Sequence, residues 1–218
     1  MKRREWLQWI AATGAAGASG LIAEALAKGD LPTGVNRLEG TATVNGSPAR
    51  VGTPVVVGDK VATGAGSQAV IVVGSDAFLM RSGTTIEFRG NERGLLSEML
   101  VASGRVLSVF SKKPVAIKAA SASIGIRGTG AYLEIYPDSV YFCLCYGDAL
   151  VEGPGMAAKE VQTKHHEQPL VIREKGGIMS AEPGPFQNHT DAELIMLEAL
   201  VGREPPFMKD ATYPAKHY

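Results

Sequence analysis

Residues 64–76 read Gly64-Ala65-Gly66-Ser67-Gln68-Ala69-Val70-Ile71-Val72-Val73-Gly74-Ser75-Asp76. A run of apolar, mostly β-branched residues (69–73) lies between two groups of small and turn-forming residues. Short apolar runs bounded by glycine, serine and aspartate are typical of β-strands, whereas a helix needs a longer stretch with a period of about 3.6 residues. This stretch therefore predicts one short strand between two turns.

The same pattern extends in both directions, from about residue 35 to about residue 151. It predicts further strands at residues 55–57, 84–88, 106–110, 115–117, 131–136 and 140–146. Turn residues separate them, and a helical period occurs only as a candidate turn near Glu92–Leu100. Many short strands with regularly spaced turns predict an all-β domain, which could be a sandwich, a barrel or a solenoid-like stack.

The pattern changes after residue 155. Thr190-Asp191-Ala192-Glu193 is a capping-box motif that starts a helix. The apolar residues that follow fall on one helical face: Leu194, Leu197, Leu200 and Val201. Gly202 and the prolines at 205–206 end the helix. We therefore expect a C-terminal extension, residues 156–218, with one short α-helix at about 191–201 and an extended tail.

The first 27 residues have the three parts of a signal peptide. Arg3 and Arg4 form a charged pair, a short Ala/Gly-rich apolar run follows, and Ala25 and Ala27 supply a small-x-small cleavage site. The paired arginines indicate the twin-arginine export route. The apolar run is shorter than the roughly 20 residues of a membrane-spanning helix. We therefore expect residues 1–27 to be removed after export by the twin-arginine translocase, which leaves a periplasmic protein without a spanning helix.

The composition limits the choice of partner. The chain has 22 basic and 22 acidic residues, and the near-neutral balance persists in the predicted mature part. A nucleic-acid-binding protein needs a basic surface, so a nucleic-acid partner is not expected. The apolar content of 45% is ordinary for a globular protein, and two cysteines do not form a disulfide scaffold.

Residues 36–152 carry two groups of motifs that resemble the FecR family. The first group comprises Val44-Asn45-Gly46, the run from Gly52 through Gly58-Asp59-Lys60-Val61-Ala62-Thr63-Gly64, and Ser67–Ile71. The second comprises Gly104-Arg105-Val106, Ile124-Gly125-Ile126-Arg127-Gly128-Thr129 and Gly147–Val151. The resemblance implies an extracytoplasmic FecR-like β-domain, residues 28–155, of solenoid-like or sandwich character. It also implies sensing and cell-surface signalling, best known in the regulation of iron uptake, and no enzymatic activity.

The motif residues suit a scaffold. Gly58-Asp59 and Gly64 are expected at positive-φ positions of tight turns. Gly125 and Gly128 are expected to let strands cross or pack closely, and Arg127 to bond turn carbonyls or pair with an acid. These glycines could also suggest a phosphate-binding loop, but no strand-to-helix context follows them. Turn and packing roles are therefore the favoured interpretation.

Cys143 and Cys145 lie two residues apart in a predicted strand, so their side chains share one face. Side chains at this spacing have Cβ atoms about 6–7 Å apart, whereas a disulfide needs about 3.8 Å. The pair is therefore not expected to form a disulfide, even in an oxidising compartment. Two neighbouring thiolates can instead bind one soft or borderline metal ion.

Three of the four histidines are candidate partners of the cysteine pair: His165 and His166 beside Glu167, and His189 directly before the predicted helix. The fourth, His217, lies in the tail and is the least favoured. Cys143, Cys145 and two of these histidines would form a four-ligand set for zinc or copper, with an iron–sulfur centre as a third choice. The alternative without metal is that the cysteines are small buried residues and the histidines lie in a solvated loop.

Three functions stay open at this point. The favoured one is a periplasmic FecR-like binding or sensing protein with a metal site, in envelope signalling or metal-related sensing. The second is a metal-free interaction module that binds a protein or glycan partner in the envelope. The third is a small metal-dependent redox enzyme, although no esterase, metalloprotease or dinucleotide-binding motif is present.

Overall fold

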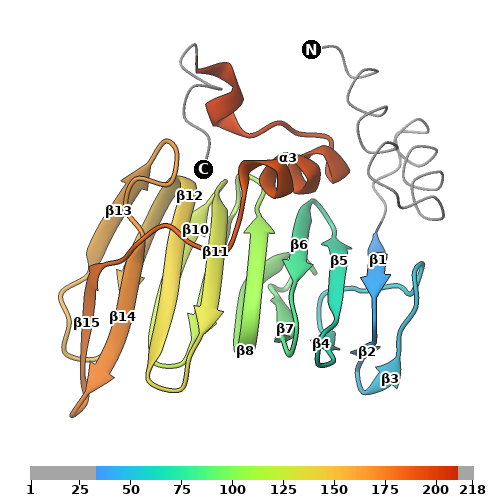
Figure 1. Cartoon of the computed structure of the whole chain (residues 1–218), viewed down its shortest axis with the longest axis horizontal. Coiled ribbons are helices and arrows are strands. Elements are labelled where there is room, and N and C mark those ends of the chain that lie inside the picture. Colours follow the sequence, from blue (N-terminus) through green and yellow to red (C-terminus); the bar gives the residue numbers. More distant parts are fainter. Residues whose placement is uncertain (1–32, 211–218) are drawn as a thin grey trace.

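The computed structural model describes residues 33–210, where it contains fifteen strands, one α-helix and one short 3-10 helix (Figure 1). The predicted all-β fold with a short C-terminal α-helix is confirmed. The predicted signal peptide (residues 1–27) and the end of the tail (from residue 211) lie outside the described residues.

The strands form two sheets. Sheet A contains, in spatial order, β1 (Gly34–Glu39), β5 (Gln68–Val73), β6 (Asp76–Met80), β8 (Leu96–Val109), β11 (Gly130–Ile135), β12 (Ser139–Glu152), β14 (Leu170–Lys175) and β15 (Ile178–Pro183). Sheet B contains β3 (Ser47–Pro48), β2 (Ala42–Val44), β4 (Lys60–Thr63), β7 (Thr85–Gly90), β8, β9 (Pro114–Ala119), β10 (Ala122–Arg127), β12 and β13 (Lys159–Thr163). All neighbours are antiparallel except β8 and β9.

Two long strands, β8 and β12, belong to both sheets and join them. Each changes sheet at a glycine with positive φ, Gly104 (+84°) in β8 and Gly147 (+98°) in β12. A Cβ atom at Gly104 would lie 2.4 Å from the Cα of Thr84, and one at Gly147 would lie 2.7 Å from Cγ2 of Thr129. Both corners therefore require glycine. The result is a sandwich whose two sheets share strands.

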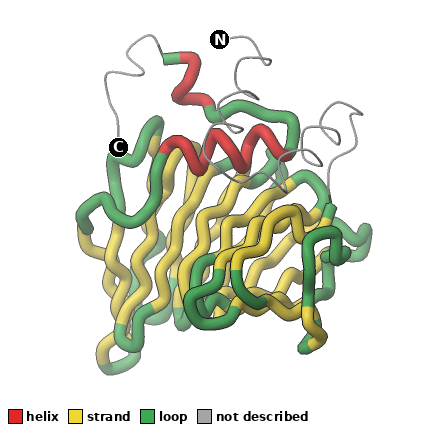
Figure 2. Tube along the Cα trace, turned by 45° about the vertical axis from the view of Figure 1, so that its right-hand side comes forward, coloured by secondary structure: helices red, strands yellow, loops and turns green. Residues whose placement is uncertain are grey.

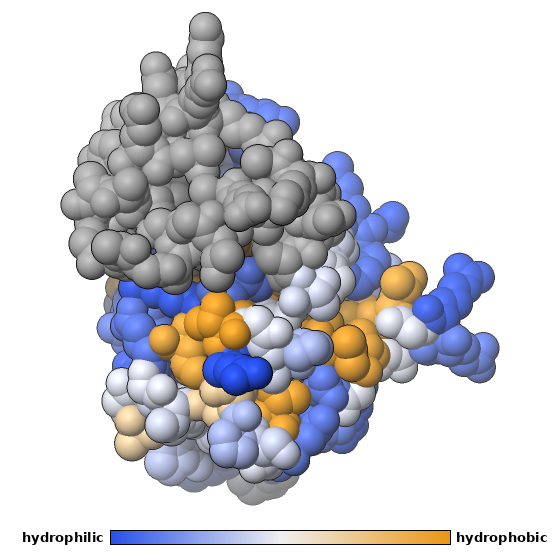
Figure 3. Space-filling view, turned by 90° about the vertical axis from the view of Figure 1, so that its right-hand side faces the viewer, coloured by the Kyte–Doolittle hydropathy of each residue, from blue (hydrophilic) through white to orange (hydrophobic). Residues whose placement is uncertain are grey.

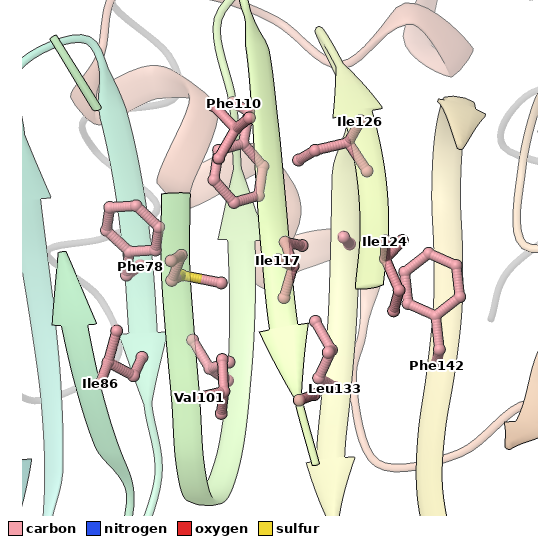
Figure 4. Packing of buried hydrophobic residues seen from close by; sticks show 14 of the residues in the cluster. Phe78, Ile86, Val101, Phe110, Ile117, Ile124, Ile126, Leu133 and Phe142 are labelled. Carbon is pink, nitrogen blue, oxygen red and sulfur yellow. The ribbon is translucent and has the colours of Figure 1, made fainter. Parts of the chain in front are cut away.

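The main core lies between the two sheets. Large apolar side chains from both sheets meet there and point toward one another in Figure 4, among them Phe78, Phe110, Ile117, Ile124 and Phe142. The ring of Phe78 lies 4.8 Å from that of Phe88 and 5.6 Å from that of Phe110, measured between centroids. Strand alternation supplies this core, since every second residue of β10 is buried.

A second apolar cluster lies on the outer face of sheet A, under α3 (Asp191–Leu200). Figures 1 and 2 show the helical segments on one side of the strands. The predicted capping box is present, because Thr190 accepts from the Glu193 backbone and the Glu193 side chain accepts from the Thr190 backbone. The predicted apolar face of the helix is buried, with Leu194 and Leu197 fully inside. A 3-10 helix, η1 (Pro206–Lys209), adds Phe207 to the cluster.

Two strand-level expectations were wrong. Residues 55–57 form a loop, in which the Val56 N–H donates to the Asp59 carboxylate (2.8 Å) and not to a neighbouring strand. The candidate helical turn near Glu92–Leu100 contains the start of β8, where residues from Leu96 onward pair with β7. Pairing with β7 and then with β9 favours the extended conformation there.

The sheets continue past residue 155, where the sequence pattern suggested the end of the β-domain. β13 pairs with the second half of β12 in sheet B, and β14 pairs with the first half of β12 in sheet A. β15 then pairs with β14 at the edge of sheet A. Part of the predicted extension is therefore built into both sheets.

Apolar and polar side chains are interspersed at the end of the sandwich around β1 to β3 (Figure 3). Among residues 33–210, no helix is long and apolar enough to cross a membrane.

Candidate metal centre

Cys143 and Cys145 lie in the first half of β12 and point to the outer face of sheet A. Their neighbours Phe142 and Leu144 point the opposite way, into the core between the sheets. This is the alternation that the sequence predicted for Tyr141–Tyr146. Both cysteines are fully buried and both are free thiols. The cluster under α3 therefore contains two sulfur atoms.

Two histidines reach the cysteines from separate segments. His166 belongs to the loop after β13, where its backbone N–H donates to the Cys145 carbonyl (3.0 Å) and its φ of +57° turns the chain. His189 belongs to the segment between β15 and α3, next to Asn188, whose φ is +60°. Both imidazoles are 3% exposed, so they lie inside the protein.

The four side chains bring one donor atom each to a common point, and these atoms all lie within 4.8 Å of one another. Sγ of Cys143 is 3.6 Å from Nδ1 of His166, and Sγ of Cys145 is 3.4 Å from Nε2 of His189. The two ring nitrogens are 3.2 Å apart.

These three separations match those expected between ligands of a tetrahedral zinc site. Zn–S bonds of about 2.3 Å and Zn–N bonds of about 2.05 Å at the tetrahedral angle place the ligands about 3.6 Å (N to S) and about 3.3 Å (N to N) apart. The measured values differ from these by about 0.2 Å or less. The donor set is therefore close to the size that a zinc ion requires.

The outer nitrogen of each histidine has a protein partner. His189 Nδ1 donates to the Gln187 carbonyl (2.7 Å), and His166 Nε2 donates to the Asp191 carboxylate (3.1 Å). When both rings are neutral, these bonds leave a lone pair on the nitrogen that faces the cysteines, which is Nδ1 in His166 and Nε2 in His189. Ligating histidines almost always have such an outer partner, which fixes the tautomer. The two facing lone pairs require a cation between them, either a proton or a metal ion.

His165 is placed differently from His166. Its Nε2 lies 2.9 and 3.0 Å from the two oxygens of Asp191, and its ring packs on Phe207 at a centroid distance of 4.5 Å. Of the three candidate histidines, His166 and His189 therefore join the cysteines, whereas His165 holds the carboxylate that orients His166. His165, His166 and Asp191 form a second cluster of potential ligands, but their spacing is that of hydrogen bonds.

The charges around the centre are tuned by these contacts. The pKa of the Cys143 thiol is lowered to about 4. The largest cause is a hydrogen bond with the Cys145 side chain, and contacts with His166 and His189 lower the pKa further, whereas burial raises it. The pKa of Cys145 is raised, chiefly by burial and then by the neighbouring Cys143. Burial disfavours charge on both His166 and Asp191. Burial is the largest single influence on each pKa, but the mutual hydrogen bond, together with Cys143 beside His166 and His165 beside Asp191, outweighs it, so the pKa of His166 is raised and that of Asp191 lowered. Of the two thiols, Cys143 is therefore the more readily deprotonated.

A polar network holds the segment that carries His189. The ring of Tyr132 stacks on His189 at 4.5 Å, and its hydroxyl donates to Glu134 (2.5 Å). The Asn188 amide also donates to Glu134 (2.6 Å), as does the hydroxyl of Tyr136. Burial opposes the charge on Glu134, but these three hydrogen bonds lower its pKa. The Glu134 carboxylate therefore restrains His189 indirectly, through Asn188 and the stacked Tyr132.

In the first group of FecR-like motif residues, Gly58 and Asp59 lie in a turn, and Thr63 ends β4. Gly58 has a φ of +103°, as expected, and the Asp59 carboxylate accepts from Asn45 (2.7 Å). Thr63 accepts from the Thr84 N–H (3.0 Å). Gly64 does not have the expected positive φ; a Cβ there would lie 2.3 Å from Oγ1 of Thr41, so close packing is what requires glycine.

The second group is less uniform. Gly128 has a φ of +67° in a turn, and the Thr129 carbonyl accepts from Phe110 (2.9 Å). Arg127 is exposed at the end of β10, and it does not bond turn carbonyls or pair with an acid within the described residues. Gly125 was expected to allow close packing, yet a Cβ there would meet a single atom, the Leu150 carbonyl oxygen at 3.9 Å. Neither residue therefore has the expected scaffold role.

Sequence reasoning missed Asp191 as part of the centre. Its place in the capping motif explained it as a first-turn acid of α3, and this it also is. The available signal was an acid two residues after His189, since carboxylates commonly orient ligating histidines. Tyr132 and Glu134 were missed because only the sheet places them beside His189.

No protein family and no curated protein matches this sequence. The solved structures that match its fold include two of a protein described as a "putative anti-sigma factor" from Parabacteroides distasonis. Their TM-scores are 0.48 and 0.47, at 9% and 11% sequence identity. Each match covers 63% of this chain and 71% of the other. At this level the likeness concerns the course of the backbone and carries no functional information.

Proposed function

We propose that this protein is a FecR-like periplasmic binding protein that holds one metal ion through Cys143, Cys145, His166 and His189. The observation that carries the proposal is the convergence of two buried sulfur and two buried nitrogen atoms at tetrahedral ligand spacing. A buried thiolate beside ring nitrogens is costly unless a cation compensates its charge. A metal ion would supply that compensation.

The donor set favours zinc, with copper as the second choice. Two thiolates and two imidazoles in a tetrahedron are a common structural zinc set, and copper(I) also binds thiolates well. All four positions of the tetrahedron would be filled by protein atoms, whereas a catalytic zinc keeps one position open. The set therefore supports a binding or structural role better than a metal-dependent enzyme.

The position of the site suggests what the metal does. Its ligands come from β12, from the loop after β13 and from the segment that leads into α3. A bound metal would join these three segments and hold the start of α3 against sheet A. Metal occupancy would then control the position of the helix, as a sensing or signalling protein requires. The partner would be another envelope protein.

The expected export route would allow the metal ion to bind before the protein is secreted. The paired arginines at 3–4 indicate the twin-arginine translocase, which carries folded proteins and so permits a metal to be inserted first. Replacement of both Arg3 and Arg4 by lysine is expected to keep the precursor in the cytoplasm. Cell fractionation with an antibody tests this, and a periplasmic product from the variant would contradict the assigned route.

Elemental analysis tests the metal. The full chain, purified from a host with twin-arginine export, is expected to contain about one zinc or copper per molecule. Cys143→Ser and His189→Ala are expected to lose it, whereas His217→Ala, a histidine outside the described residues, serves as the matched control and keeps it. No stoichiometric zinc, copper or iron, together with unchanged stability in Cys143→Ser, would refute the proposal.

Cobalt offers a test of geometry. Co²⁺ bound by two thiolates in a tetrahedron gives strong visible bands and a sulfur-to-cobalt charge-transfer band. We expect both in the wild-type chain, and the charge-transfer band to weaken in Cys143→Ser. An octahedral cobalt spectrum would show that the cysteines are not ligands.

A further inference from the structure

Two arginines lie side by side on the outer face of sheet A. Arg81 follows β6 and Arg105 lies in β8, each two residues from a leucine that points to this face. The Arg81 backbone N–H donates to the Arg105 carbonyl (2.9 Å), which makes the two residues cross-strand neighbours. Like charges in this position repel each other and destabilise a sheet. An anion between the two guanidinium groups would remove this repulsion.

Arg81 has partners within the protein. One of its terminal nitrogens donates to the Asn188 carbonyl (2.8 Å) and to the carboxylate of Glu193 in α3 (3.0 Å). Its guanidinium also lies over the Tyr132 ring, 6.0 Å from the centroid. These contacts fix the Arg81 side chain between sheet A and the start of α3.

The Arg105 guanidinium makes no hydrogen bond and no ion pair within residues 33–210. The acid opposite it in sheet A is Glu134 in β11, which attracts it only at a distance. The two oxygens of Glu134 already accept from four side chains: Tyr132, Tyr136, Gln187 and Asn188. A carboxylate offers about four such positions, so none is left for Arg105.

A pocket of about 370 Å³ lies beside the two arginines and the segment that leads into α3. Ser82 and Gln68 line it with them. The Ser82 hydroxyl accepts from the Gly66 N–H (2.8 Å), which leaves its own proton for a ligand. Small-molecule sites have volumes of roughly 300–1,000 Å³, so the pocket has room for a small molecule and not only for an ion.

One acid also lines the pocket. Glu39, at the end of β1, forms an ion pair with Arg37. Among the charged residues that line the pocket, Glu39 and Arg81 therefore each have an ion-pair partner within the described part of the chain, and Arg105 does not. A ligand with a negative group would complete the set.

We propose that this pocket binds the oxyanion group, a carboxylate or a phosphate, of a small polar molecule. Arg105 is its main charged contact, because a guanidinium offers two parallel N–H donors that match such a group. Ser82 and Gln68 donate the remaining hydrogen bonds, and Arg81 adds positive charge from the neighbouring strand. Neither arginine is a ligand of the cysteine–histidine centre, so the site does not depend on the metal.

Calorimetric titration tests the site. The full chain, purified from an exporting host, is titrated with inorganic phosphate and, separately, with succinate, at constant ionic strength and with sodium chloride as the control. We expect saturable binding of at least one of the two oxyanions at millimolar concentration, and none of chloride. The comparison of phosphate with succinate shows whether the bound group is a phosphate or a carboxylate.

Variants locate the binding. Arg105→Gln is expected to weaken it about tenfold or more, because a hydrogen bond to a charged group is lost. Arg105→Lys keeps the charge without the paired donors and is expected to weaken it less. Arg127→Gln is the matched control and keeps the affinity, because Arg127 is another exposed arginine but lies at the end of β10. Since Arg105 has no hydrogen bond to lose within the described residues, its variants are expected to fold, and thermal unfolding verifies this.

Any of three results would overturn the proposal. The first is that neither phosphate nor succinate binds saturably. The second is an unchanged affinity in a folded Arg105→Gln variant. The third is an equal loss in Arg127→Gln, which would show that the anion responds to the overall charge of the protein and not to this pocket.

Discussion

The two outer faces of the sandwich are built by the same strand alternation but differ in what covers them. The outer face of sheet A is covered by α3 and η1, and its polar donors are buried. The outer face of sheet B carries a hollow, with Gly125 in its floor. On the covered face, polar side chains must find partners, which favours a closed set of ligands. On the open face, solvent can satisfy the charged side chains, so no such closed set is needed.

Removal of a ligand on the covered face should give the largest effect. His189→Ala is expected to abolish metal binding, and a metal at about a thousand times its Kd stabilises a protein by about 4 kcal/mol. For a chain of this size the loss corresponds to a fall in Tm of roughly 10 °C. Calorimetry with and without a chelator measures it. An equal response to chelator in wild type and variant would place the metal elsewhere.

Asp191→Asn tests whether the Asp191 carboxylate orients the ligand His166. An asparagine amide carries no charge, and its NH2 group would replace the Asp191 oxygen that lies 3.0 Å from His165 Nε2. Loss of such an orienting group typically lowers metal affinity about 10- to 100-fold. Competition with a chromophoric chelator measures the Kd, and Asp148→Asn, an exposed acid on the open face, is the matched control. Unchanged affinity in Asp191→Asn would mean that the carboxylate only caps α3.

The Glu134 carboxylate is expected to make the stability of the covered face depend on pH. Its pKa is lowered in the folded protein, so its contribution is present above the pKa of the unfolded chain and is lost as pH falls through the folded value. Glu134→Gln is expected to cost about 1.5 kcal/mol at pH 7 and progressively less in acid. Urea unfolding at several pH values tests this. A difference that grows toward low pH would have the wrong sign.

Thr190→Ala should have a smaller effect on the covered face. The Thr190 hydroxyl accepts from the Glu193 N–H at the start of α3 (3.3 Å), and loss of such a cap costs about 1 kcal/mol. Thr190→Ser keeps the hydroxyl and should be nearly neutral. Hydrogen exchange of the first turn of α3 reports the change, and equal loss in both variants would implicate the methyl group instead.

Gly125→Ala should have the smallest effect, and of opposite sign. Alanine fits the backbone and the space at this position, so the change is expected to stabilise the fold by about 0.5 kcal/mol through the unfolded state. Gly104→Ala is the contrast, because its φ of +84° and the contact with Thr84 do not allow a side chain. A clear loss of stability in Gly125→Ala would show that the fold does require this glycine.

Sequence patterns predicted the covered face better than the open one. Alternation in 141–146 placed Cys143 and Cys145 together, and the capping motif placed α3, because both are local signals. Which histidines join the cysteines depends on contacts across 23 and 44 residues, so His165 could not be distinguished from His166. The hollow could not be predicted at all, since it forms across five strands.

The two shared strands have a consequence for how the protein folds. Because β8 and β12 each pass through both sheets, neither sheet can complete its hydrogen bonding before the other has begun to form. Such non-local pairing slows folding to about milliseconds to seconds and leaves no half that is stable alone. The twin-arginine route proposed for this chain would suit such a fold, because a translocase that carries folded proteins would receive it after the native pairing had formed.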